Sequence, residues 1–131
     1  MLYLLDTNAW LRWFHQPHEL STSVRQLLNA QQSVGLSPMS IVEVAQKHHK
    51  GRLHLNLPLD VWVTASMPQG RVKLLPITTA VALRAYTWPD DFHGDPADRL
   101  IAATAAVYGL TLVTSDDKLL TRADLKTLST R

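Results

Sequence analysis

The segment Leu2-Tyr3-Leu4-Leu5-Asp6-Thr7-Asn8 decides the fold class of this chain. Four apolar residues followed directly by residue types that cap helices predict a short, buried strand that leads into a helix. Asp6 would then lie where an open parallel sheet binds its ligands, outside the carboxyl end of a strand. The alternative is that Asp6 only caps the helix that begins near Ala9. Because a metal or acid–base site needs several carboxylates, the choice depends on what the other elements bring to that edge.

The rest of the chain alternates apolar runs with helical patterns. Further strands are expected at residues 33–37, 71–76, 110–114 and 125–128. Helices are expected at residues 9–14, 24–30, 38–50, 60–67, 80–86 and 96–107, with a loop at 88–94 and a helical turn after residue 117. This alternation predicts an α/β fold with a mostly parallel sheet covered on both faces. With no linker or repeat in the sequence, residues 1–131 are expected to form a single domain.

Composition narrows the class of protein. Apolar residues make up 46% of the chain and charged residues 18%, which predicts a folded protein with a real core. The chain has no cysteine, which excludes disulfides and cysteine-ligated zinc. No apolar run approaches the roughly 20 residues that span a bilayer, so we expect no membrane association and a cytoplasmic location. The net charge of +2 is too small to predict nucleic-acid binding by itself.

Four acidic residues are expected to meet at the carboxyl edge of the sheet. Asp6 and Asp116 follow buried strands, whereas Glu43 and Asp98 lie in helices that open beside the same edge. Each acid alone has an ordinary explanation, which for Glu43 is an exposed i,i+4 pair with Lys47. Four acids together repel one another unless a cation neutralises them. An oxygen-only cluster suits Mg²⁺, with Mn²⁺ as a substitute, better than zinc.

A carboxylate cluster of this kind has an established use in phosphodiester hydrolysis. One or two Mg²⁺ ions, about 4 Å apart where there are two, activate water and stabilise the attacking and leaving oxygens. Residues beside the acids are expected to orient the metal ligands or the attacking water. These residues are Thr7, Asn8 and Thr114.

A basic cluster follows the helix that carries Glu43. It either contacts the phosphates of RNA or forms a solvated helix end, where cations favour the helix dipole. Its lysines and arginine are Lys47, Lys50 and Arg52. His93, in the loop before Asp95, is expected to be an ordinary loop histidine, with proton transfer or an RNA contact as the alternative.

Four segments carry these acids in a fixed order along the chain. They are Leu-Leu-Asp-Thr-Asn at 4–8, Ser-Ile-Val-Glu-Val-Ala at 40–45, Asp-Pro-Ala-Asp-Arg-Leu-Ile-Ala-Ala-Thr-Ala at 95–105 and Leu-Val-Thr-Ser-Asp at 112–116. Together they resemble the PIN-domain family, and most closely the small ribonuclease toxins of the VapC type. The resemblance implies a three-layer α/β/α fold with a mostly parallel central sheet and Mg²⁺-dependent cleavage of RNA to 5′-phosphate and 3′-hydroxyl ends. It also implies a homodimer and a cognate antitoxin whose tail enters the acidic site.

The resemblance assigns roles to individual residues. The three central acids of the family correspond to Asp6, Glu43 and Asp98. Asp116 matches a more variable fourth acid, and Asp117 is expected to point elsewhere. Asp95 is either a further metal ligand or only the cap of its helix. Arg99 resembles a neutralising or phosphate-binding residue, with a surface salt bridge as the alternative.

An aromatic and apolar segment follows the first strand. It is a candidate groove for a helix of the antitoxin, with packing in the core as the alternative. Its members are Trp10, Trp13, Phe14 and Leu20.

Two other functions remain open. A phospho-acceptor signalling domain would need paired acids after the first strand, where only Asp6 stands. A catalytically silent PIN-like module that binds RNA or protein is disfavoured because all four acids are present.

Overall fold

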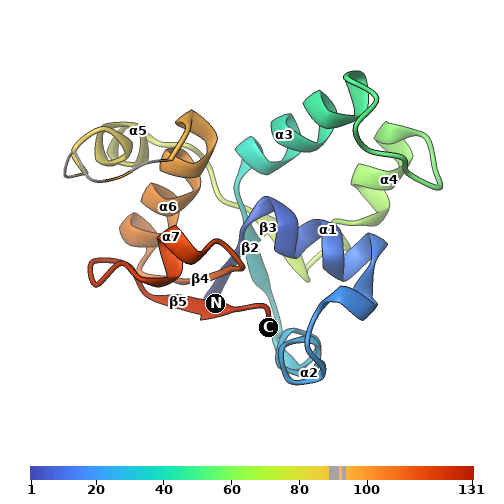
Figure 1. Ribbon diagram of the computed structural model, residues 1–131, viewed down its shortest axis with the longest axis horizontal. Helices are drawn as coiled ribbons and strands as arrows, with labels where there is room; N and C mark the ends of the chain where they lie inside the picture. Colours follow the sequence, from blue (N-terminus) through green and yellow to red (C-terminus); the bar gives the residue numbers. More distant parts are fainter. Residues whose placement is uncertain (89–91, 93) are drawn as a thin grey trace.

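A five-stranded sheet runs through the middle of the molecule (Figure 1). The computed structural model describes the whole chain except residues 89–91 and 93, so His93 and much of the predicted loop at 88–94 lie outside the described residues. The strands have the order β3-β2-β1-β4-β5, and each neighbouring pair is parallel. Their bounds are Tyr3–Leu5 (β1), Val34–Leu36 (β2), Val72–Leu74 (β3), Thr111–Thr114 (β4) and Thr127–Ser129 (β5). The expected parallel sheet is therefore confirmed.

Helices connect the strands and cover both faces of the sheet. Their bounds are Thr7–His15 (α1), Thr22–Ala30 (α2), Pro38–His49 (α3), Leu59–Ala65 (α4), Thr79–Ala85 (α5), Pro96–Tyr108 (α6) and Asp117–Leu120 (α7), with a 3₁₀ turn at Pro17–Glu19. Every predicted helix and strand is present, with ends shifted by a few residues. Among the described residues, no helix has the length and apolar character needed to cross a bilayer.

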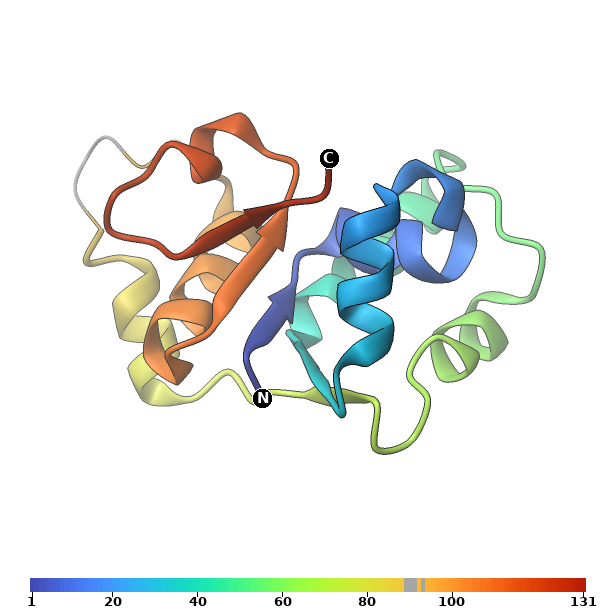
Figure 2. The same cartoon turned by 90° about the horizontal axis from the view of Figure 1, so that it is seen from below.

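Alternate residues of the central strands face two different cores. Leu5 on β1 packs in the cluster that contains Leu28 of α2 and Trp62 of α4. Leu4, its neighbour on the same strand, packs on the other side in the cluster that contains Ile101 of α6. This alternation follows from the pleat of a strand, whose successive side chains point to opposite faces. Helices therefore lie on either side of the sheet (Figure 2), which gives three layers.

Helix caps gather at the carboxyl edge of the sheet. Parallel strands all end at this edge, so the helices that follow β1, β2 and β4 begin there, and α6 begins there too because it leads back to the start of β4. Each of these helices starts at a residue whose side chain accepts a backbone N–H of the first turn. The capping residues are Asp6, Ser37, Asp95 and Asp116.

The aromatic segment of α1 belongs mainly to the core. Trp10 is fully buried, and its Nε1–H donates to the backbone oxygen of Ser66 at 2.7 Å. Its ring lies 5.0 Å from that of Trp62, and Leu20 is only 4% exposed. The prediction that Trp10 and Leu20 line an antitoxin groove is therefore wrong, because both side chains are buried in the core cluster that also contains Trp62 and Leu5. Trp13 and Phe14 remain half-buried.

Candidate functional site

Asp6 lies directly after β1, at the carboxyl edge of the sheet. Its backbone N–H donates to the oxygen of Val113 on β4 at 3.0 Å, which holds the turn against the sheet. One carboxylate oxygen caps α1 by accepting the N–H of Ala9 at 2.7 Å. Burial raises the pKa of Asp6, while hydrogen bonds from Thr114 and Ala9 act in the opposite direction and nearby Glu43 raises it further. Asp6 therefore caps the helix and also lies within the field of a second acid.

Glu43 approaches this position from α3. Its carboxylate accepts a hydrogen bond from the hydroxyl of Thr7, and the hydroxyls of Thr7 and Ser40 lie 3.0 Å apart. Ser40 is fully buried and Thr7 is 5% exposed, so this network is shielded from water. None of the ion pairs between described residues involves Glu43. The explanation of Glu43 as an exposed partner of Lys47 is therefore wrong, because α3 turns the carboxylate toward α1.

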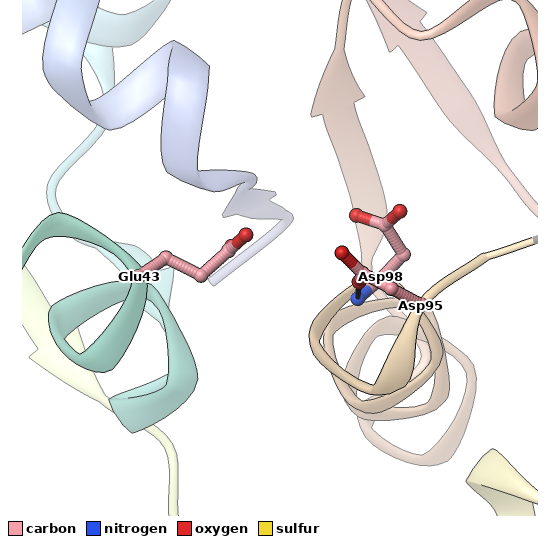
Figure 3. Close-up of side chains that lie close together, drawn as sticks. All are labelled: Glu43, Asp95 and Asp98. Carbon is pink, nitrogen blue, oxygen red and sulfur yellow. Dashed lines mark hydrogen bonds between the residues drawn. The ribbon is translucent and has the colours of Figure 1, made fainter. Parts of the chain in front are cut away.

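Asp95 and Asp98 stand at the start of α6, across from Glu43 (Figure 3). Asp95 caps the helix by accepting the N–H of Asp98 at 2.9 Å. One oxygen from each of Glu43, Asp95 and Asp98 lies within 4.8 Å of the other two. Burial, together with the charges of Asp95, Glu43 and Asp116, raises the pKa of Asp98 to about 6, with burial the largest cause. A cation placed among these oxygens would relieve this repulsion.

Asp116 completes the group from the end of β4. Its carboxylate caps α7 by accepting the N–H of Lys118 at 2.9 Å, and its own N–H donates to the hydroxyl of Thr114 at 3.1 Å. Thr114 is fully buried, so its hydroxyl anchors the turn after β4 from within the protein. Asp117 is exposed and pairs with Arg131 at 3.2 Å. As predicted, Asp117 points away from the other acids.

The four predicted acids line one pocket. Besides Asp6, Glu43, Asp98 and Asp116, the lining includes Thr7, Asn8, Lys47, Ile101 and Leu119. The pocket encloses about 70 Å³, which is room for a metal ion with some of its water. The chain has no cysteine, and the described residues of the lining supply carboxylate oxygens and include no histidine. This donor set fits a hard divalent cation such as Mg²⁺ or Mn²⁺ rather than zinc.

Arg99 makes contacts that the sequence did not predict. Its guanidinium donates to the backbone oxygens of Ala85 at 3.1 Å and Phe92 at 2.9 Å. It also lies over the rings of Tyr86 and Phe92, at 5.3 and 5.2 Å from their centres. Arg99 therefore ties α6 to the end of α5 and to Phe92. No ion pair between described residues includes Arg99, whereas its contact with a substrate phosphate stays a prediction.

The remaining predicted residues divide into two groups. Asn8 and Lys47 line the pocket, whereas Lys50 and Arg52 are exposed beyond the end of α3. Ser40 was not predicted to contribute, although its spacing gave a signal. Residues three apart on a helix share a face, so Ser40 lies beside Glu43 on α3.

Comparisons with known proteins agree with this geometry. The PIN domain family matches residues 3–125 of the chain. Ribonuclease VapC22 from Mycobacterium tuberculosis (strain ATCC 25618 / H37Rv) is 34% identical over 116 residues, which cover 88% of each chain. The structure of VapBC2 from Rickettsia felis, bound to a DNA fragment from its promoter, matches with a TM-score of 0.75 at 16% sequence identity. The structure of DNA-bound VapBC from Salmonella typhimurium matches with a TM-score of 0.73 at 19% sequence identity. Each of these two matches covers 98% of both chains, and the predicted three-layer fold is confirmed.

Proposed function

Since this chain belongs to the PIN-domain family, we propose that it is a metal-dependent endoribonuclease and the toxin of a toxin–antitoxin pair. The observation that carries the proposal is the single pocket lined by carboxylates from four separate elements. A fold has no need to gather like charges in this way, and a phosphodiesterase site does. The relative VapC22 is named a ribonuclease, and chains of similar fold occur in VapBC complexes.

Mg²⁺ is the cation that we assign to the pocket, with Mn²⁺ as a substitute. The residues that would hold it are Asp6, Glu43, Asp98 and Asp116, with Asp95 at the rim. When bound, the ion supplies positive charge and Lewis acidity for the hydrolysis of a phosphodiester to 5′-phosphate and 3′-hydroxyl ends. Because Asp98 has a raised pKa, metal binding competes with a proton there and is expected to strengthen as the pH rises through about 6.

The side chains around the acids keep the pocket in one shape. The hydroxyls of Thr7 and Thr114 hold Glu43 and Asp6, respectively, in place. Ile101 and Leu119 form an apolar part of the wall, which limits the water around the carboxylates. Lys47 faces the same pocket and is suited to a phosphate of the RNA, while exposed Lys50 and Arg52 extend the positive charge along the same helix end.

Two protein partners belong to the same proposal. An acidic pocket is a good receptor for a basic side chain of an antitoxin tail, which would occupy the place of the metal. A homodimer is supported by apolar side chains exposed on the neighbouring helices α5 and α6 and at the residue that follows α5. Leu83 and Tyr86 are 65% and 63% exposed, and Val107 and Tyr108 are 42% and 37% exposed. Light scattering of the wild type and of Leu83→Glu checks this, with a dimer expected for the first and a monomer for the second.

The decisive experiment is the cleavage of a total RNA pool by the purified protein. It compares the wild type with Mg²⁺, the wild type with a chelator, Asp6→Asn, and Asp117→Asn as a matched control. Asp117 is exposed and lies outside the pocket, so its variant is expected to cleave like the wild type. Discrete fragments with 5′-phosphate ends, lost with chelator and in Asp6→Asn, support the proposal.

Other outcomes favour different conclusions. Cleavage that survives both the chelator and Asp6→Asn would mean a contaminating nuclease or a metal-free mechanism. An absence of cleavage for every RNA, with binding retained, would favour a catalytically silent module that only binds RNA or protein.

A further inference from the structure

A second, smaller pocket adjoins the acidic pocket on the side of α7. It shares Asp98 and Asp116 with the acidic pocket and continues to Phe92, Lys118 and Arg122. The two pockets therefore meet along the carboxylates at the starts of α6 and α7. An RNA strand that crosses the acidic pocket from the side of α3 would reach Lys118 on the side of α7.

The two ends of this path carry one lysine each. Lys47 lines the acidic pocket from α3, and Lys118 lines the smaller pocket from α7. RNA carries a negative charge at every nucleotide, so the phosphates on both sides of a cleaved bond approach a rim of carboxylates. Cations at these two places offset the repulsion that the acids would otherwise exert on the flanking phosphates.

Lys118 suits this role better than the neighbouring Arg122. The guanidinium of Arg122 is bound by both oxygens of Asp124, at 2.8 and 2.6 Å, and lies 4.8 Å from the ring centre of Phe92. Its side chain is only 10% exposed. Lys118 is exposed, and no ion pair between described residues includes it. Lys118 is therefore accessible to a ligand at the smaller pocket.

The position of Lys118 is fixed relative to the acids. Its backbone N–H donates to the carboxylate of Asp116 at 2.9 Å, so a shift of Lys118 would also disturb a predicted metal ligand. The smaller pocket has a volume of about 30 Å³, less than half that of the acidic pocket at about 70 Å³.

We propose that Lys118 binds the RNA phosphate that flanks the cleaved bond on the side of α7. This inference rests on the proposed ribonuclease function. Lys118 binds the substrate without regard to base sequence, because phosphate contacts carry no sequence information.

The first test measures RNA binding against salt concentration in the Asp6→Asn background with a chelator. The probe is a fluorescently labelled oligouridylate, and the variants are Lys118→Gln and Lys73→Gln. Lys73 is an exposed lysine on β3, the edge strand, and lies outside both pockets. Lys118→Gln is expected to reduce the slope of log affinity against log salt by about 0.7, the contribution of one phosphate contact on a single strand. Equal slopes for the two variants would overturn the inference.

The second test measures cleavage in the active protein. Lys118→Gln is expected to raise KM several-fold with little change in kcat, because a flanking phosphate is bound equally in the ground and transition states. Lys118→Arg, which keeps the charge, is expected to restore KM. If the wild type cleaves RNA and Lys118→Gln matches Lys73→Gln, the inference fails and the proposed function stands. If the wild type cleaves no RNA, the proposed function fails, and the salt slope alone decides whether Lys118 binds phosphate.

Discussion

The hydroxyl of Thr7 donates a hydrogen bond to the carboxylate of Glu43 and so joins the first turn of α1 to the middle of α3. Thr7 follows Asp6 directly in the chain, whereas Glu43 is 36 residues away. The contact therefore fixes one predicted ligand relative to another across two helices. Ser40, one turn before Glu43 on α3, closes the network by its contact with the same hydroxyl.

Replacing Thr7 by valine tests this contact. Thr7→Val keeps the shape of the side chain but leaves Glu43 and Ser40 without their partner. We expect the free energy of unfolding to fall by about 1–3 kcal/mol, the usual cost of an unpaired buried polar group. Urea denaturation measures this loss, and RNA cleavage is expected to fall with it because Glu43 is no longer oriented. Thr7→Ser retains the hydroxyl, so a serine variant as impaired as the valine variant would contradict the role of the hydrogen bond.

The raised pKa of Asp98 predicts a pH dependence of stability in metal-free protein. Because the pKa is about 6 in the folded state and 3.8 ordinarily, the folded state binds more protons than the unfolded state between these values. The contribution of Asp98 to the free energy of unfolding is therefore complete below its ordinary pKa of 3.8 and is lost as the pH rises through about 6. Asp98→Asn removes the charge, so its melting temperature should exceed that of the wild type above this window and converge with it at the acidic end. Thermal denaturation across this range checks the sign, and a less stable asparagine variant above the window would contradict it.

Metal binding should stabilise the folded state. Addition of Mg²⁺ or Mn²⁺ to chelator-treated protein is expected to raise the melting temperature in proportion to the logarithm of the metal concentration once the site is saturated. Asp6→Asn should lose most of this increase, because Asp6 lines the pocket. Asp117→Asn serves as the control, since that carboxylate lies outside the pocket and pairs with Arg131. An equal increase in both variants would place the metal elsewhere.

Arg99 is expected to matter for stability more than for substrate binding. Its guanidinium binds two backbone oxygens, which a lysine cannot do with the same fork of donors. Arg99→Lys should therefore lower the free energy of unfolding by about 1–3 kcal/mol, although the charge is kept. The variant should also show a salt dependence of RNA binding equal to that of the wild type. A stable variant with weakened RNA binding would instead support the phosphate-binding interpretation.

Much of the fold follows from neighbouring residues in the sequence. Asp95-Pro96 at the start of α6 and Gly109 at its end were readable because caps depend on residues within one turn. Gly109 takes a left-handed conformation with φ of 68°, which glycine adopts without strain. The four acids were also found from the sequence, because parallel strands must end at one edge and helices that lead back must begin there.

Contacts between distant segments were decided only by the tertiary structure. Whether Glu43 pairs with Lys47 or meets Thr7 depends on how α3 rotates against α1, and the local sequence allows both. Burial of Trp10 against Trp62 likewise depends on how α4 packs against α1. Ser66, which accepts the hydrogen bond of Trp10 just after α4, lies 56 residues further along the chain than Trp10. The sequence by itself determined the elements, their caps and the gathering of acids, since these follow from local hydrogen bonding and strand direction. The orientation of each side chain depends on which surface meets it, and only the packed structure decides that.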